Sequence, residues 1–514
     1  NNFGYSATSD SKGFLYSGSS AFGNKYPITT GAYNEIFTGG IVDIAISKFD
    51  TTGAFLIYST YIGGDSDELP HSLIVNSFDE LFILGTTSSL NYPYTTNAYD
   101  TSFNGGTPNN LTNGLGVNYI NGSDIIVSRL TSEGDSLLAS TYIGGSGNDG
   151  LNSTAAMNSP LNVLKYNYAD EVRGEIDIDK NNNIYIISST QSNTDFPIEG
   201  NPFQPNYGGG AIDACIIKLD NSLQNIIWSS YLGGEDHDAG YSLSIDSNDD
   251  IYLTGGTSSN LFPKTNNVLG PTFNGGRSDG FVTHVNKNGQ QMINSTYYGS
   301  IAYDQSYFVE LDKFDNVYLF GQTEIIDSTF VKNVIWSEPG SGQFISKITP
   351  ELDSLMYSTV FGSGNGINIS PTAFLVDLCS KIYLTGWGGG PNTSTSFTSN
   401  NAGNTTDMYT TPDAQDTTTN GNDFYIMVLE DDASGIFYGS FFGGSASSEH
   451  VDGGTSRFDK KGKVYQAMCA GCGGNSDMTI KPSFDHELDT NNSNSGCNLG
   501  VFKMDFGLPI VVAD

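Results

Sequence analysis

The stretch SLSIDSNDDIYLTGGTSSNLFPKTNNVLGPTFNGGRSDGFVTHVNKNGQQMINSTYYGS, residues 242–300, decides the fold. It contains four short runs with alternating apolar residues, each ending at Asn, Asp or Gly, as is typical of β-strands. The first two runs are joined by the tight hairpin connection SNDD. The stretch therefore predicts one four-stranded antiparallel sheet. The four runs are Ser242–Asp246, Ile251–Gly255, Gly280–Val285 and Gln291–Tyr298.

The same unit recurs along the chain, and self-similarity of this kind is the signature of a repeat architecture. Most units close on a motif such as YSTYIGG at Tyr58–Gly64 or SSYLGG at Ser229–Gly234. The spacing of these closing motifs varies because long inserts separate some of the strands. Seven units are predicted, at residues 4–64, 72–145, 175–234, 242–300, 308–364, 373–444 and 455–506.

Seven such units predict an all-β fold, a seven-bladed β-propeller of four-stranded antiparallel blades over residues 1–507. A two-sheet sandwich would not need seven similar units, and a parallel β-helix has much shorter coils. By analogy with other propellers, the first strand of each unit is expected to line the central channel and the fourth to lie outermost. The seventh unit lacks a fourth-strand motif, so its outer strand has to come from upstream of Asn1 or from residues 508–514. Those last residues are otherwise a linker to a following domain.

The charge balance limits the partners of the chain. It has 56 acidic and 21 basic residues and a net charge of −35. This argues against nucleic acid and anionic membrane surfaces, which need clustered Lys and Arg. It suits a cation-rich extracellular setting in which acidic loops collect Ca²⁺, although an acidic surface also simply favours solubility. No run of 18 or more apolar residues exists, so no helical membrane span is expected.

The repeated pattern, with Asp–Asn turns, an F-P pair, a G-G pair and a closing YSTYxGG, resembles the SBBP family of β-propeller repeats. The last two units also resemble large surface proteins of Bacteroidota that carry a gliding-motility-associated C-terminal domain and are exported by the type IX secretion system. The motifs that carry this second resemblance are DLCSKIYLTGWGGG at Asp377–Gly390, SSEHVDGGTSRFDKKGKVYQ at Ser447–Gln466 and CAGCGGNSD at Cys469–Asp477.

The resemblance implies a secreted protein on the outer face of the outer membrane, in which the propeller is a non-enzymatic scaffold or adhesion module. The partners it implies are outer-membrane components of the type IX export and gliding machinery, and surface polysaccharide. Two alternatives stay open. One is a carbohydrate-active hydrolase or lyase with carboxylates at the channel mouth, and the other is a Ca²⁺-dependent glycan-binding module.

Acidic residues recur in two places of the unit. An Asp before the third strand is interpreted as accepting backbone N–H bonds in a turn, rather than as part of a ring of functional carboxylates. The links from one unit to the next are also acidic, and they are expected on one face near the channel mouth. Carboxylates there can bind calcium, although solvated polar loops are the favoured explanation. The calcium candidates are Asp65, Asp67, Asp149, Asp236, Asp238 and Asp452.

Five cysteines leave at least one thiol unpaired within the chain. Cys469 and Cys472 form a CxxC pair, which with Cys379 and Cys497 makes a zinc site conceivable. In an exported protein a disulfide is the usual outcome. We therefore expect two of Cys469, Cys472 and Cys497 to pair, and Cys215 and Cys379 to be buried thiols.

No catalytic residue is predicted. The sequence has no G-x-S-x-G elbow, H-E-x-x-H motif or Walker loop. The four Arg are too dispersed for a carboxylate clamp of the sialidase type, although a glycosidase carboxylate pair is compatible with the composition. Function is expected where the units depart from regularity: the SEHVDGG link, the GWGGG turn, the Cys-bearing seventh unit and the inserts 107–122, 146–172 and 391–421.

Overall fold

The computed structural model describes residues 2–111, 115–153, 164–394, 399–472, 478 and 497–506, and the structural statements below concern these ranges. Strands make up nearly all of the regular structure, as expected for Ile-, Val- and Tyr-rich runs between Gly, Asn and Asp turns. The described helices are single 3-10 turns, none with the length and apolar character that a membrane crossing requires. They are η1 (Asp170–Val172), η2 (Ser328–Phe330), η3 (Gly390–Thr393) and η4 (Asp431–Ala433).

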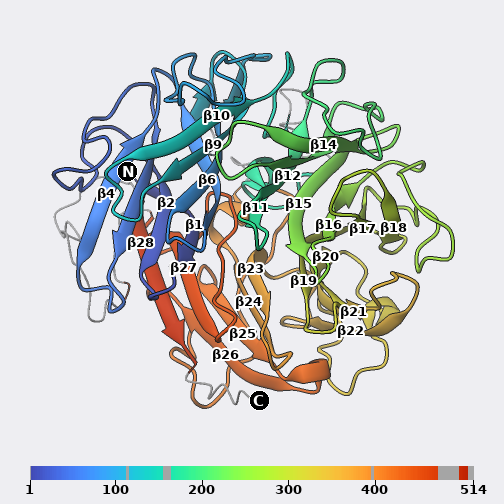
Figure 1. Ribbon diagram of the computed structural model, residues 1–514. Helices are drawn as coiled ribbons and strands as arrows, with labels where there is room; N and C mark the ends of the chain where they lie inside the picture. Colours follow the sequence, from blue (N-terminus) through green and yellow to red (C-terminus); the bar gives the residue numbers. More distant parts are fainter. Residues whose placement is uncertain are drawn as a thin grey trace, which may run out of the picture.

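Four-stranded antiparallel sheets stand around a common centre as the blades of a propeller (Figure 1). Within each sheet the four strands of one unit are hydrogen-bonded in sequence order. The first three blades are β1 (Asn2–Ser9), β2 (Leu15–Ala21), β3 (Asp43–Phe49), β4 (Leu56–Ile62); β5 (Glu68–Val75), β6 (Leu81–Thr87), β9 (Asp124–Leu130), β10 (Leu137–Ile143); and β11 (Glu175–Ile178), β12 (Ile184–Thr190), β13 (Asp213–Leu219), β14 (Ile226–Leu232). The next three are β15 (Asp238–Ile245), β16 (Ile251–Thr257), β17 (Asp279–Val285), β18 (Met292–Tyr298); β19 (Asp304–Leu311), β20 (Val317–Thr323), β21 (Gln343–Ile348), β22 (Leu355–Phe361); and β23 (Ser370–Val376), β24 (Ile382–Trp387), β25 (Phe424–Leu429), β26 (Ile436–Phe442).

The first strand of each blade lies at the centre of the ring. β5 packs against β1 and β11, β15 against β11 and β19, and β19 against β23, so the first strands are neighbours of one another. The apolar core lies between the faces of adjacent blades. Trp228, for example, packs edge-on against Tyr185 with ring centroids 6.3 Å apart, in a cluster that also holds Leu253 and Phe281 of the fourth blade.

The prediction of seven four-stranded blades is wrong, because the described residues form six. The seventh unit forms a two-stranded sheet of β27 (Lys463–Ala470) and β28 (Asn498–Asp505). This sheet lies between the first and the sixth blade (Figure 1), where β27 packs against β1 and Phe502 packs against Phe424. The two ends of the described chain therefore meet in the ring.

Among the described residues, the seventh unit lacks a regular strand at each of its two edges. The segment before β27 contains Gly453 and Gly454 with φ values of 121° and 79°, a conformation that does not continue a strand. It makes isolated bridges instead, such as Ser72 with Thr455 and His450 with Cys469. No fourth-strand motif follows β28, and the predicted closing strand or linker at 508–514 lies outside the described residues.

The insert in the second unit forms a small hairpin of its own, β7 (Asn109–Leu111) and β8 (Val117–Tyr119). It is fastened to the blade because the Asn118 backbone N–H donates to Asp67 Oδ2 at 2.7 Å and the Tyr119 hydroxyl meets Thr86 Oγ1 at 2.7 Å. This insert is therefore a folded part of the face that carries the links between blades.

Candidate functional sites

The central channel is filled at one end by the protein itself. Residues 164–174, called the channel segment below, form hydrogen bonds to strands of blades across the ring. This segment contains the end of the predicted insert 146–172 and the two residues after it. The Tyr241 hydroxyl and the Gln305 amide donate to Leu164 O at 3.2 and 3.0 Å, and the Tyr168 hydroxyl donates to Asp452 at 2.5 Å. Contacts with β15, β19 and the link before β27 place this segment in the channel.

A buried ion pair anchors the channel segment. The Arg173 Nε donates to Asp170 Oδ1 at 2.7 Å, and both its Nη groups donate to Pro371 O at 3.2 Å. The guanidinium carbon lies 4.3 Å from the centre of the Tyr307 ring. Asp170 is fully buried and Arg173 is 5% exposed, so each charge depends on the other.

At the other end of the channel there is a cavity of about 420 Å³. It is lined by β11, β15, β19, β23 and the residues before β27, together with the hairpins that join first to second strands. These hairpins lie on the face opposite the links between blades. The cavity walls combine three Phe rings with acidic and basic side chains. Those used below are Phe308, Phe374, Phe458, Glu175, Asp177, Glu310, Arg457 and Lys460.

Some of the charged side chains in this channel-mouth cavity form ion pairs, and one carboxyl group has a raised pKa. Arg457 Nη2 lies 3.2 Å from Glu175 Oε1, and Arg457 Nη1 lies 3.8 Å from Asp177 Oδ1. Burial raises the pKa of Glu310 to about 7, an effect that Lys460 opposes and Glu175 reinforces. A carboxyl group with a pKa near neutrality next to carboxylates has the properties of a general acid.

From the sequence, Arg457 was only one of four dispersed Arg residues, and Glu175, Asp177 and Glu310 were not expected to share a cavity with it. A signal was present. When the units are aligned on the acid of the first hairpin (Asp179, Asp312 and Asp459), the residues two positions earlier are Asp177, Glu310 and Arg457. Residues at one register position of the inner strands face the same channel, and these three come from the third, fifth and seventh units.

The recurring Asp before the third strand accepts backbone N–H bonds, which confirms its interpretation as a turn residue. Its Oδ2 accepts from the N–H of Thr38, Asn104, Gly208, Asn274 or Asn420, at distances of 2.6 to 3.1 Å. The five residues are Asp43, Asp124, Asp213, Asp279 and Asp423.

Each of these Asp residues is one half of a buried carboxyl pair. The other half is an acid that opens the next inner strand or lies in the link before it. In three pairs both carboxyls converge on the closing glycine, which is Gly63, Gly144 or Gly443. In the other two pairs the charge of the second acid raises the pKa of the first. A Cβ on Gly63, for example, would lie 2.5 Å from Asp43 Oδ1 and 2.7 Å from Glu68 Oε2, which explains the glycine. The pairs are Asp43–Glu68, Asp124–Asp149, Asp213–Asp238, Asp279–Asp304 and Asp423–Glu449.

Burial keeps these carboxyl pairs from being fully ionised. It raises the pKa of Asp213 to about 8 and that of Asp238 to about 7. The Oδ1 atoms of both have no hydrogen-bond donor among the described residues, and a proton kept by one carboxyl supplies that donor. The fifth blade has the amides Gln343 and Asn368 at the two positions, around Gly362. The side-chain N–H groups of these amides can act as hydrogen-bond donors, so no carboxyl proton is needed at this position.

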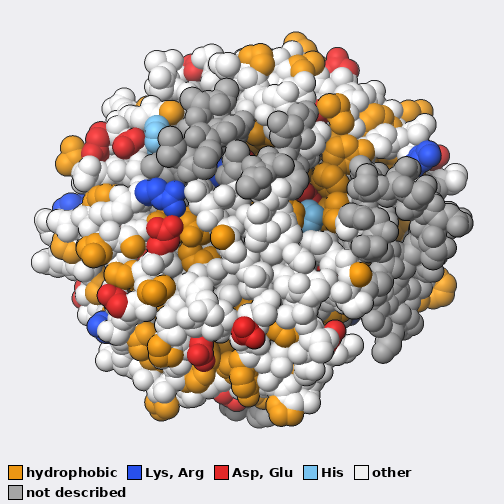
Figure 2. Space-filling view, turned by 180° about the vertical axis from the view of Figure 1, so that it is seen from behind, with side chains coloured by type: hydrophobic (Ala, Val, Ile, Leu, Met, Phe, Trp, Pro, Cys, Tyr) orange, Lys and Arg blue, Asp and Glu red, His pale blue; other side chains and the backbone are white. Residues whose placement is uncertain are grey.

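The six calcium candidates are not brought together. Asp149 and Asp238 belong to separate carboxyl pairs, and Asp67 accepts N–H bonds from Ile41, Val42 and Asn118. Asp65 and Asp236 are exposed on different blades, and Asp452 lies beside Cys469. On the face seen in Figure 2, the visible acidic side chains are scattered among uncharged ones.

Within the described ranges, two groups of three or more His, Cys, Asp or Glu bring their ligand atoms within 4.8 Å of one another. The first, Asp246, Asp250 and His284, is a variant of a feature of other blades. In those blades a Lys pairs with the hairpin Asp over a Tyr ring, as Lys218 does with Asp179. In the fourth blade His284 stacks on Tyr252 with centroids 4.1 Å apart. The arrangement therefore has a structural explanation.

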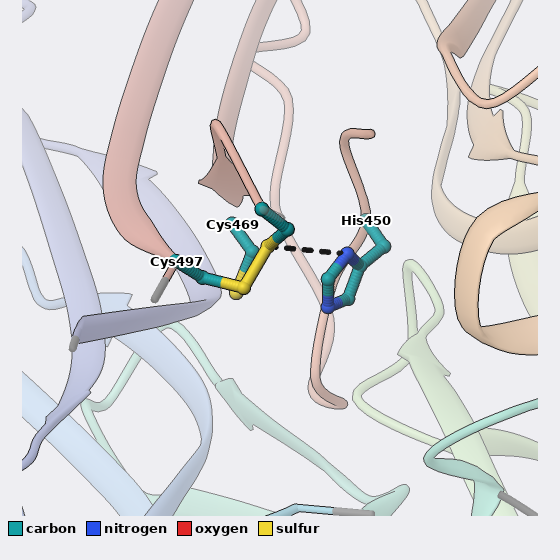
Figure 3. A group of neighbouring side chains, drawn as sticks. His450, Cys469 and Cys497 are labelled. Carbon is teal, nitrogen blue, oxygen red and sulfur yellow. Dashed lines mark hydrogen bonds between the residues drawn. A yellow bond between two sulfur atoms is a disulfide. The ribbon is translucent and has the colours of Figure 1, made fainter. Parts of the chain in front are cut away.

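The second group contains three of the cysteines (Figure 3). Cys472 and Cys497 form a disulfide, and Cys469 is a buried free thiol. Cys215 is buried as expected, but the same expectation for Cys379 is wrong: its thiol is exposed. The reason is that Cys379 lies in a hairpin turn, where its N–H donates to Asp377 Oδ1 at 2.7 Å.

Sequence comparison supports a propeller repeat protein. The sequence model of the SBBP β-propeller repeat family matches residues 227–263, the stretch that runs from β14 to just beyond β16. The chain is a β-propeller repeat protein. None of the curated protein sequences matches it.

Solved structures with a similar fold have unrelated sequences. A protein of unknown function from Dyadobacter fermentans is 10% identical, with a TM-score of 0.40, and the match covers 76% of this chain and 91% of that one. A PL25 ulvan lyase is 9% identical, with a TM-score of 0.43 and 91% of both chains covered. The propeller domain of the Trilobed protease from Pyrococcus furiosus is 8% identical, with a TM-score of 0.37, covering 91% of this chain and 89% of that one. At these values the likenesses carry no argument about activity.

Proposed function

We propose that the chain is a non-enzymatic propeller module of a secreted cell-surface protein, acting as a scaffold or adhesion part of a type IX secretion substrate associated with gliding motility. The observation that carries the non-enzymatic part is the channel segment, which fills the central channel at one end. The carboxyl pairs support it, because they are buried and held by backbone N–H groups.

The resemblance of the last two units to Bacteroidota surface proteins supports the gliding and export part of the proposal. The partners proposed are outer-membrane components of that machinery and surface polysaccharide. The net charge of −35 favours partners with a basic surface and disfavours nucleic acid.

Binding to immobilised polysaccharides and to purified outer membranes tests this function. We expect saturable binding that leaves the polysaccharide intact and is not reversed by a chelator. Loss of binding in EDTA would instead favour the Ca²⁺-dependent glycan-binding alternative. Absence of binding to both surfaces would contradict an adhesion role.

A second candidate function, a carbohydrate-active hydrolase or lyase, is favoured by one observation, the channel-mouth cavity. Its Phe-lined walls and the raised pKa of Glu310 have the character of a sugar-binding site with an acid catalyst. This function predicts that Glu310→Gln lowers turnover by at least about 100-fold, whereas Glu235→Gln, at an exposed link on the opposite face, leaves it unchanged. Equal turnover of a cleaved substrate by the wild type and by Glu310→Gln would exclude a catalytic role for Glu310.

A further inference from the structure

Four ligand-forming side chains meet where the link before the seventh unit, β27 with the turn after it, and the start of β28 come together (Figure 3). Of the residues labelled in Figure 3, His450 comes from the link after the sixth blade, Cys469 lies in β27, and Cys497 immediately precedes β28. Cys472 lies in the turn after β27. Their ligand atoms all lie within 4.8 Å of one another. An antiparallel bridge fixes the relation of the first two, since the Cys469 N–H donates to His450 O at 2.7 Å.

The orientation of His450 is that of a metal ligand with a supporting carboxylate. Its Nδ1 faces the sulfurs, 3.8 Å from Cys472 Sγ, while Nε2 faces Asp452, 3.5 Å from Oδ2. Metal-binding histidines usually donate their second ring N–H to a carboxylate, which fixes the tautomer that leaves the other nitrogen free for the metal.

The surroundings hold this arrangement in place. The Tyr168 hydroxyl of the channel segment donates to Asp452 Oδ1 at 2.5 Å, and the Cys469 thiol donates to Oδ2 of the same carboxylate. The rings of Tyr168 and Trp387 lie 5.7 and 5.6 Å from the His450 ring. The buried wall excludes water on one side, as in structural metal sites.

Three thiolates and one imidazole form the donor set of structural zinc sites. The disulfide uses two of the four ligands. Asp452 Oδ2 is a shared partner of His450 Nε2 and the Cys469 thiol, but it does not explain why His450 Nδ1 faces Cys472 Sγ. A disulfide alone needs neither of them. Convergence of all four side chains is what a tetrahedral ion requires.

We propose that, when the Cys472–Cys497 disulfide is reduced, His450, Cys469, Cys472 and Cys497 bind one Zn²⁺ ion in a Cys₃His site. A thiol or phosphine reductant supplies the two electrons that break the S–S bond, and two protons convert the sulfurs to thiols. The ion then displaces the protons of three thiols to solvent and forms three Zn–S bonds and one bond to His450 Nδ1. Metal and disulfide are thus alternative ways to join Cys472 to Cys497.

Co²⁺ titration of the full chain tests the site, because tetrahedral Co²⁺ bound by thiolates has characteristic visible absorption. The phosphine-reduced, anaerobic protein should titrate five thiols and bind one Co²⁺, which Zn²⁺ then displaces. The oxidised protein should titrate three thiols, since the chain has five cysteines and the disulfide removes two, and show no such spectrum. Verified reduction without the spectrum, or the same spectrum before reduction, would overturn the proposal.

Variants separate the ligands from the other cysteines. Cys469→Ser and His450→Ala should abolish or alter the tetrahedral spectrum, whereas Cys379→Ser and Cys215→Ala should retain it in full. Asp452→Asn, which changes a positioning residue, should weaken Co²⁺ binding by about 10- to 100-fold while the spectrum keeps its shape. Circular dichroism of each variant checks that it is folded. Full binding by a folded Cys469→Ser protein with an unchanged spectrum would contradict the assigned ligand set.

Discussion

Raising the pH from about 6 to about 9 is expected to lower the thermal stability of this protein, with a fall in Tm of the order of 10 °C. The cause is the set of buried carboxyl pairs. Their folded pKa values, about 8 for Asp124, Asp213 and Asp279 and about 7 for Asp149 and Asp238, lie above the value of 3.8 for a free Asp. A raised folded pKa means that the stabilisation is complete below the unfolded pKa and is lost as the pH rises through the folded one.

The size of the effect follows from the number of pairs. One pKa unit corresponds to about 1.4 kcal/mol. Between pH 6 and pH 9 a carboxyl with a pKa of about 8 therefore costs about 3 kcal/mol of stability, and one with a pKa of about 7 costs about 1.4 kcal/mol. The other charged groups near these pairs are acids, so their negative charge raises the pKa values of the paired carboxyls further. They are Asp67, Asp100, Asp195, Asp236, Glu324 and Asp416.

A variant that imitates the fifth blade provides the control. Asp213→Asn with Asp238→Asn copies the amide pair of Gln343 and Asn368, and it should remove one pair's share of the pH dependence. Asp65→Asn with Asp413→Asn changes two exposed carboxyls and should leave the profile unchanged. Differential scanning calorimetry at fixed scan rate measures both. A wild-type Tm that is constant or rises from pH 6 to 9 would show that the pairs hold no proton.

Replacing Arg173 with Met should destabilise the protein by about 3–5 kcal/mol, because Asp170 is then left as an unpaired charge in the channel. For a chain of this length 1 kcal/mol corresponds to about 1 °C, so Tm should fall by about 3–5 °C. The channel segment should also become a site of early proteolysis, since its anchor to Pro371 and Tyr307 is lost.

Arg277→Met is the matched control for this prediction. Arg277 pairs with Glu324 at 3.1 Å, but the two side chains are 34% and 43% exposed, and such a pair contributes about 1 kcal/mol or less. If Arg173→Met and Arg277→Met have the same small effect on Tm, the channel segment is not held by the buried ion pair.

The blade was predictable from the sequence because each strand pattern recurs. The alternating runs, the hairpin acid and the closing G-G motif each have a local cause, and six repetitions make the pattern plain. The seventh unit was not predictable in the same way. Its strand content depends on how Gly453 and Gly454 bend the chain and on what pairs with β28, which are not local properties.

The sites were less predictable than the fold, since they depend on contacts between units. The acidic links suggested a calcium site, but Asp149 and Asp238 instead face the third-strand Asp of the preceding blade. No local pattern places His450 beside Cys469 and Cys497, because this contact requires the link, β27 and the start of β28 to meet. The insert 146–172 was a candidate by its length alone, and only the folded ring shows that part of it enters the channel.

Incubation of the purified 514-residue chain with a panel of neutral, sulfated and uronic-acid polysaccharides tests the central claim most directly. New reducing ends and unsaturated uronic ends are measured over time. A channel occupied by residues 164–174 and carboxyl pairs that serve the fold predict no product above the level of a heat-inactivated control. Sustained product formation that disappears in Glu310→Gln would contradict a non-enzymatic propeller and would make the channel-mouth cavity its active site.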